Sequence, residues 1–298
     1  MSDNPIRYGV ILRSDNFKVG RPINVGRRSA THKMFQIASI SKVITGIIVA
    51  KFCENGVLDY DTEINRYLNT WKCPQRGITL RMLLTHTSSA RKSGFRGYPI
   101  STRSMPTPLE TVVKWIRFEG RPGETEEYAG IGYQIIQLVI EDVTGKSLAW
   151  HINHIFDQLN LQQTTGKILR PTQRRYELAA YDDYNLFPET AAAGIWMSAD
   201  DLMSILLDVC RSYRDDTGVV LHQTSARNML SKQRGYRSAL GPMVDTEPVL
   251  SFYHGGHNVG YRNSFVAYPD TGRCEIIMTH YNPIITDLDL GKIMQMHP

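Results

Sequence analysis

The amino-acid sequence predicts a protein of mixed α/β (α+β) class, in which a helical insertion interrupts one sheet domain. Two observations lead to this prediction. Short strand-like runs occur near both ends of the chain, and residues at helical spacing dominate its middle. The chain has 298 residues, which is enough for one large domain or two ordinary ones, so an inserted second unit is compatible with its length.

Composition narrows the class of protein further. Hydrophobic residues make up 42% and charged residues 21% of the chain, which is typical of soluble globular proteins. The longest strongly apolar run covers only Ile44 to Ala50, so no membrane-spanning helix of about 20 apolar residues is predicted. Residues 1–5 are polar and lack the pattern of a secretory signal, and we therefore expect a cytoplasmic protein without a membrane partner.

Charge and cysteine content argue against two other classes. The net charge of +5, from 34 basic and 29 acidic residues, is too weak over this length to indicate nucleic-acid binding. The four cysteines lie far apart and form no CxxC pair, so neither a zinc site nor a thioredoxin-like motif is predicted. We expect reduced, mostly buried thiols, as in cytoplasmic proteins.

The predicted elements follow in order along the chain. Residues 8–12 alternate as in a strand, and a polar connection follows them. At Ser39 the period changes to that of a helix, because apolar residues at positions 40, 43, 44, 47 and 48 form one stripe. Ser39 stands where an N-cap or first-turn residue would stand, and Gly56 is expected to end the helix.

The remaining chain changes from helical to strand-like patterns. Further helices are predicted over 80–84, 106–118, 132–143 and 150–159. A capping sequence at Ser198 predicts another helix. The C-terminal part predicts short strands over 252–254, 263–268 and 274–279. Turn signals separate these strands at Gly255-Gly256 and at residues 269–272.

Ser39-Ile40-Ser41-Lys42 is the first segment with a chemical rationale. Residues i and i+3 share a face of a helix, so Lys42 can reach the Ser39 hydroxyl, take its proton or lower its pKa, and make it a nucleophile. The pattern alone is unspecific, because Ser89 to Lys92 shows the same spacing in an expected loop. Spacing therefore leaves two interpretations of Ser39 open: a nucleophile, or an ordinary N-cap serine beside a solvent-exposed lysine.

Five segments in the same order resemble one family. Residues 35–42 are similar to the nucleophile motif of the serine β-lactamase and penicillin-binding-protein superfamily. They are most similar to the branch with class C β-lactamases, family VIII carboxylesterases and D-alanyl-D-alanine carboxypeptidases. The other matching segments are residues 83–88 (LLTHTS), residues 120–133, residues 193–202, and His254-Gly255-Gly256 with Gly260. The resemblance runs from about Tyr8 to about Tyr281. Any one motif is unspecific, but five motifs in the same order are a strong indication of the family.

The resemblance implies a β-lactamase-like fold, with an antiparallel sheet flanked by helices and a mainly helical inserted domain. We expect residues 1–66 and 190–298 to form the sheet domain and residues 67–189 the helical domain. The active site is expected between them, because ligand clefts often lie at domain interfaces.

The resemblance also implies a role for each matching residue. Ser39 would be the acylated nucleophile, Lys42 would assist its deprotonation, and Tyr128 would act as a general base or proton shuttle. A free tyrosine, with a pKa of about 10, is a poor base at neutral pH, and a neighbouring ammonium would favour its phenolate form. His254 would line the site, and the backbone N–H groups of Ser39 and His257 would form the oxyanion hole.

Three further residues complete the expected site. Gly256, in the third motif, is expected to line it. The asparagine of the family's Y-x-N motif is Gly130 here, in Tyr128-Ala129-Gly130. In relatives this amide hydrogen-bonds the lysine and can bind an amide-bearing acyl group, so glycine either favours esters and small acyl groups over β-lactams and peptides, or weakens catalysis. Tyr261 is a candidate substrate contact, with a surface turn as the alternative.

No metal or organic cofactor is expected. His254 and His257 form an H-x-x-H pair, but the family position explains His254 without zinc. His86, in the LLTHTS segment, is interpreted as a structural residue that holds a loop through hydrogen bonds.

These features favour a serine hydrolase that acts on an ester or amide of a small molecule through a Ser39 acyl-enzyme, and an esterase-like enzyme rather than a true β-lactamase. One alternative is an acyltransferase that uses the same acyl-enzyme. The other is a non-catalytic binding or assembly protein that kept the fold, which Gly130 supports and the intact Ser39, Lys42 and Tyr128 oppose. The expected partner is a small-molecule substrate, and the sequence does not indicate the oligomeric state.

Overall fold

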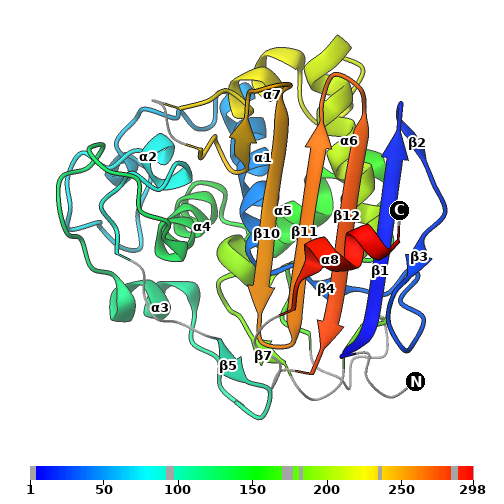
Figure 1. Ribbon diagram of the computed structural model, residues 1–298. Helices are drawn as coiled ribbons and strands as arrows, with labels where there is room; N and C mark the ends of the chain where they lie inside the picture. The colour runs from blue at the N-terminus through cyan, green and yellow to red at the C-terminus, as the bar shows by residue number, and fades with distance from the viewer. Residues whose placement is uncertain are drawn as a thin grey trace.

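A computed structural model describes residues 5–91, 97–169, 177–180, 184–233, 237–282 and 288–297. Within these residues the main feature is a seven-stranded antiparallel sheet in the order β2-β1-β12-β11-β10-β9, with β3 also paired to β1 (Figure 1). Its strands are β1 (Ile6–Asp15), β2 (Lys18–Val19), β3 (Ile23–Asn24), β9 (Met243–Asp245), β10 (Ser251–Asn258), β11 (Tyr261–Tyr268) and β12 (Arg273–Tyr281). Because β1 pairs with β12, strands from both ends of the chain meet in one sheet, as predicted.

Helices cover both faces of this sheet. On one face, α6 (Ala199–Asp215) packs against β1 and β12, and α7 (Gln223–Met229) packs against α6 and α1. On the other face, α8 (Leu290–Met296, red) crosses in front of β11 and β12 (Figure 1). The first helix, α1 (Ser41–Glu54), is buried at every position from 41 to 50. The predicted single apolar stripe is therefore wrong, because α1 is a core helix contacted from all sides.

The helices from the middle of the chain lie beyond the β10 edge of the sheet or behind it (Figure 1). They are α2 (Leu80–Leu84), α3 (Pro108–Trp115), α4 (Gly130–Thr144) and α5 (Leu148–Ile155). The start of α6 has the predicted cap, since Ser198 Oγ accepts a hydrogen bond from the N–H of Asp201 at 3.1 Å. The predicted domain boundaries, residues 1–66 with 190–298 and residues 67–189, stay a prediction.

Short elements connect these layers. The short strands are β4 (Phe35–Gln36), β8 (Trp196–Met197) and β6 (Thr164–Thr165) in one sheet, and β5 (Tyr98–Pro99) with β7 (Asn185–Leu186) in another. The 3₁₀ turns are η1 (Ala38–Ile40), η2 (Ile64–Arg66) and η3 (Asp157–Leu159), and η4 (Thr190–Gly194) is a π-helix. No helix in the described part of the chain is both long and apolar enough to cross a membrane.

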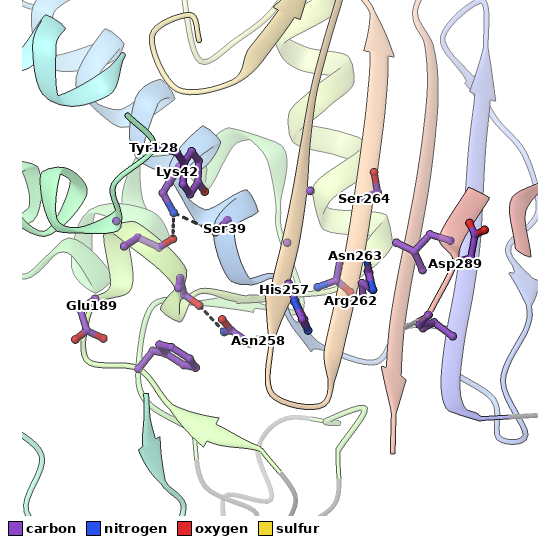
Figure 2. A pocket seen from close by; sticks show the side chains of 18 of the residues that line it. Ser39, Lys42, Tyr128, Glu189, His257, Asn258, Arg262, Asn263, Ser264 and Asp289 are labelled. Carbon is purple, nitrogen blue, oxygen red and sulfur yellow. Dashed lines mark hydrogen bonds between the residues drawn. The ribbon is translucent and has the colours of Figure 1, made fainter. Parts of the chain in front are cut away.

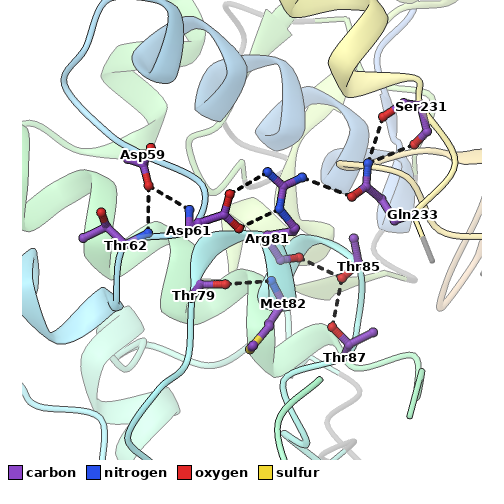
Figure 3. A network of polar contacts seen from close by, with 10 residues as sticks. All are labelled: Asp59, Asp61, Thr62, Thr79, Arg81, Met82, Thr85, Thr87, Ser231 and Gln233. Carbon is purple, nitrogen blue, oxygen red and sulfur yellow. Dashed lines mark hydrogen bonds and ion pairs between the residues drawn. The ribbon is translucent and has the colours of Figure 1, made fainter. Parts of the chain in front are cut away.

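A polar network fixes α2 and the segment that follows it (Figure 3). The Arg81 guanidinium forms two hydrogen bonds with the Asp61 carboxylate, at 2.7 and 2.8 Å, and a third with Gln233 Oε1 at 3.0 Å. The Thr85 hydroxyl then bonds that of Thr87 at 3.0 Å. Because Gln233 belongs to a distant part of the sequence, this network ties the helical region to the chain that leads into β9.

The predicted turn at Gly255-Gly256 is wrong, because both glycines lie inside β10, and the chain reverses at residues 259–260 instead. Their neighbourhood gives the physical reason. A Cβ atom on Gly256 would lie 2.2 Å from the carbonyl oxygen of Ile37, just before η1. Glycine at this position thus permits the close approach of two backbones. Within a strand, glycine often marks such a site.

Candidate active site

Ser39 lies in η1, the 3₁₀ turn that leads directly into α1. The preceding residue, Ala38, has a φ of 52°, a left-handed conformation that costs a non-glycine residue on the order of 1–2 kcal/mol. The N–H of Ile37 donates to the carbonyl of Ile195 at 3.0 Å and so helps to hold this backbone in place. Strain beside a candidate nucleophile is consistent with a functional constraint on the turn.

Lys42, in the first turn of α1, is the partner of Ser39. Its side chain is buried, and Nζ donates to Ser39 Oγ at 3.1 Å and to the carbonyl of Ala192 at 2.8 Å (Figure 2). The i, i+3 spacing therefore brings the two side chains together. The solvent-exposed lysine of the alternative interpretation is wrong. An amine in this position can take part in moving the serine proton.

Tyr128 stands on the loop before α4, with its ring centroid 5.0 Å from Lys42 Nζ. His86 fastens this loop, because its carbonyl accepts from the N–H of Glu127 at 2.8 Å and its Nδ1 accepts from the N–H of Ala129 at 3.1 Å. The His86 and Tyr128 ring centroids are 4.4 Å apart. Burial, followed by the Lys42 charge, lowers the pKa of His86, so the neutral ring can accept through Nδ1. The structural interpretation of His86 is confirmed.

His254 also lies near Tyr128, with the ring centroids 6.1 Å apart. Burial, and secondly the Lys42 charge, lowers the pKa of His254 to about 4, so its ring is neutral at pH 7. Its Nδ1 donates to the carbonyl of Gly255 at 2.6 Å. His254 is thus close to the candidate catalytic groups, but it is not among the residues that line the cavity that they share.

The end of β10 presents backbone groups to the turn that holds Ser39. Asn258 lies opposite Tyr261 across a two-residue turn. Hydrogen-bonded and non-bonded pairs alternate in an antiparallel ladder, so the N–H of His257 points away from β11, toward the edge against which η1 packs. The predicted oxyanion role requires this direction, and the role itself stays a prediction. The exposed His257 imidazole bonds the Tyr281 hydroxyl at 3.0 Å.

A cavity of about 840 Å³ contains Ser39, Lys42 and Tyr128, and Gly130, Gly256 and His257 also line it. It extends past β10 and β11 to the start of α8 (Figure 2). Gly130 leaves its wall open, because a Cβ atom there would have the Cβ of Ala192, at 3.9 Å, as its nearest neighbour. Among the described residues, no group of three or more His, Cys, Asp or Glu side chains is arranged to hold a metal ion.

Comparison with known sequences decides the family. The sequence model described as "Beta-lactamase" matches residues 15–291 of the chain. The chain belongs to the beta-lactamase family. The resemblance to the serine β-lactamase and penicillin-binding-protein superfamily and the predicted β-lactamase-like fold are thereby confirmed.

Solved structures of the superfamily share the fold. A D-stereospecific amidohydrolase from Streptomyces sp. has a TM-score of 0.75 at 19% identity, over 92% of this chain and 89% of that one. An octameric penicillin-binding protein homologue from Pyrococcus abyssi has a TM-score of 0.74 at 19% identity, over 93% and 70%. D-amino acid amidase from Ochrobactrum anthropi SV3 has a TM-score of 0.75 at 16% identity, over 93% and 87%.

Curated relatives match over a shorter part of the chain. Penicillin-binding protein 4* of Bacillus subtilis is 27% identical over 173 residues, which are 54% of this chain. Protein flp of Staphylococcus aureus is 25% identical over 186 residues, which are 56% of this chain. In each case the match spans 37% of the relative's own length.

Sequence reasoning missed two cavity residues of this beta-lactamase family member. Glu189 is 1% exposed, and neither carboxyl oxygen has a hydrogen-bond partner in another of the described residues. Burial raises the pKa of Glu189 to about 8. Gln134, on α4, is also buried, and its Oε1 likewise lacks a partner. The one sequence signal for Glu189 is an isolated acid before the small apolar residues 191–193.

Tyr261 is not a substrate contact. Its side chain is fully buried against Trp196, with ring centroids 5.6 Å apart, and its hydroxyl donates to the carbonyl of Ala179 at 3.0 Å. The alternative of a surface turn is also wrong, because Tyr261 begins β11 and faces the core. Successive side chains of a strand point to opposite faces, so the next residue, Arg262, lines the cavity instead.

Proposed function

We propose that this protein hydrolyses an ester or amide of a small molecule through an acyl-enzyme on Ser39. The observation that carries the proposal is the 3.1 Å contact between Lys42 Nζ and Ser39 Oγ in a cavity that can hold a small substrate. Membership of the beta-lactamase family supports the same chemistry. The proposed steps use the chain's own groups and water.

In acylation, Ser39 Oγ attacks the carbonyl carbon of the substrate, and negative charge develops on the carbonyl oxygen. The N–H groups of Ser39 and His257 are the proposed donors to this oxyanion. The serine proton passes by way of Lys42 and Tyr128 to the leaving group, whose bond to the acyl carbon breaks. The products are acylated Ser39 and a free alcohol or amine.

In deacylation, water attacks the acyl carbon while Tyr128 accepts one of its protons. The bond to Ser39 Oγ breaks, Oγ recovers a proton, and the acid leaves. An alcohol or amine in place of water would make the protein an acyltransferase, which is the alternative that this chemistry includes.

Gly130 supports small esters over β-lactams. Glycine cannot offer the amide of the family's Y-x-N motif to an amide-bearing acyl group, so this source of lactam and peptide recognition is missing. An ester also has a better leaving group than an amide. Its cleavage therefore depends less on the transfer of a proton to the leaving group. The amidohydrolase and amidase with the same fold make amides the second substrate class to be tested.

The proposal is tested by steady-state hydrolysis of p-nitrophenyl butyrate, butyryl p-nitroanilide and a penicillin. We expect wild-type turnover of the ester at the highest kcat/KM and complete loss in Ser39→Ala. Ser264→Ala is the matched control, because Ser264 lines the same cavity. Equal turnover by wild type and Ser39→Ala would refute the proposal. Release of p-nitrophenol only in the presence of an added alcohol or amine would identify an acyltransferase.

A further inference from the structure

A carboxyl group in the wall of the cavity lacks a partner. Glu189 comes directly before η4, lines the cavity that contains Ser39 and is 1% exposed. Neither of its carboxyl oxygens has a hydrogen-bond partner in another of the described residues. Buried polar groups in folded proteins nearly always have partners, so this exception within a candidate active site calls for a ligand or another explanation.

Helix α4 adds a second unpartnered acceptor to this wall. Gln134 Oε1 is buried and has no partner within the described residues. Gln137, one turn later on the same helix face, accepts through Oε1 from the N–H of Ala191 at 3.1 Å. The face of α4 that carries Gln134 therefore packs against the segment that begins with Glu189. This part of the wall holds three buried acceptor oxygens without matching donors.

No cation of the described protein neutralises Glu189. The η4 segment packs against α1, α4 and α5, whose buried titratable side chains are Lys42, Tyr133 and His151. Lys42 already donates to the serine and to a main-chain carbonyl. Burial raises the pKa of Glu189 to about 8, and none of these side chains offsets this effect. When Glu189 is ionised, this wall is therefore short of one positive charge as well as of hydrogen-bond donors.

We propose that Glu189 and Gln134 form a subsite for a protonated amine, so that the esters or amides processed at Ser39 carry an ammonium group. An ammonium supplies three N–H donors and one positive charge, which match three acceptor oxygens and the missing charge. A neutral hydroxyl would bring one donor and leave the carboxylate unpaired. The inference rests on the proposed function of this cavity and names the substrate class that this function leaves open.

Ammonium binding at this subsite requires ionised Glu189. With a pKa of about 8, its ionised fraction rises from about 1% at pH 6 to about 90% at pH 9. An alkylamine with a pKa of about 10, like that of lysine, stays protonated over this range. The affinity for an alkylammonium is therefore expected to rise by roughly 50- to 100-fold from pH 6 to pH 9.

The probe is n-butylammonium, with 1-butanol as the neutral molecule of the same chain length. Each is tested as a competitive inhibitor of p-nitrophenyl butyrate hydrolysis by the full chain between pH 6 and pH 9. We expect butylammonium to bind at least ten-fold more tightly than 1-butanol at pH 9. Glu189→Gln is expected to remove this preference and Gln134→Leu to weaken it several-fold. Asp270→Asn, which removes an exposed carboxylate outside the cavity, should leave it unchanged.

Ligand-observed NMR of butylammonium with Ser39→Ala measures the same binding without turnover. If wild type hydrolyses neither the ester nor the amide, the proposed function fails, and this NMR experiment still tests the subsite. Equal affinity for the two probes at every pH would overturn the inference. A preference that survives Glu189→Gln would overturn it as well. A third result would also overturn the inference: Glu189→Gln loses turnover of the neutral ester but still prefers butylammonium to 1-butanol. That result would give Glu189 a catalytic role instead.

Discussion

Replacement of Glu189 by glutamine is predicted to change how the stability of the protein depends on pH. Burial raises the pKa of this carboxyl from 4.5 to about 8. The folded protein then holds the proton more tightly than the unfolded chain does, so wild-type stability is lost as the pH rises toward about 8. Between pH 6 and pH 9 this linkage amounts to about 2.5 kcal/mol, at roughly 1.4 kcal/mol for each pH unit.

Urea denaturation of wild type and Glu189→Gln at pH 6 and pH 9 measures this effect. Glutamine does not titrate, and the other titrating groups cancel in the comparison. We expect the free energy of unfolding of Glu189→Gln, relative to wild type, to be about 2.5 kcal/mol higher at pH 9 than at pH 6. Asp270→Asn, which alters an exposed carboxylate, should show no such change. An equal difference between wild type and Glu189→Gln at both pH values would refute the reasoning.

Three further predictions concern the candidate site. Lys42→Met is expected to lower kcat/KM for p-nitrophenyl butyrate about 10³-fold without lowering the melting temperature, since it removes a proton carrier and a buried charge together; unchanged kinetics would contradict the proposed role. Gly256→Ala places a Cβ 2.2 Å from a main-chain oxygen, whereas Gly255→Ala meets its nearest neighbour at 3.9 Å. Urea denaturation should show a loss of about 2 kcal/mol for the first and little change for the second. A Cβ atom at Gly130 has its nearest neighbour at 3.9 Å, and Gly130→Asn is expected to raise the rate of penicillin acylation, measured by intact mass. A folded variant with no gain would contradict this explanation of substrate selectivity.

Local patterns predicted much of the fold. The helix at 80–84 has the predicted bounds, Ser198 caps α6, and the last C-terminal strand, β12, pairs with the first strand, β1. The spacing of Ser39 and Lys42 also predicted their contact, because i and i+3 residues of a helical turn share a face. These features depend on near neighbours in the sequence or on a hydrophobic period.

Features that depend on contacts between segments far apart in the sequence could not be predicted in this way. Gly256 was interpreted as a turn residue, because the residues next to it in the sequence do not indicate that the Ile37 carbonyl packs against it. Tyr261 was placed in the site from its position after a motif, but strand alternation points its ring into the core and exposes Arg262 instead. Glu189 resembles a loop residue, and only the packing of η4 on α4 buries it without a partner.

The most direct test of the central claim, a Ser39 acyl-enzyme, is intact-mass spectrometry after incubation with acylating probes. The probes are p-nitrophenyl acetate and butyrate, a fluorophosphonate, a penicillin and a cephalosporin, each applied to wild type and to Ser39→Ala. The account predicts a single covalent adduct on wild type with an ester or the fluorophosphonate, and no adduct on Ser39→Ala. An adduct of the same mass on Ser39→Ala, or none on folded wild type with any probe, would contradict it.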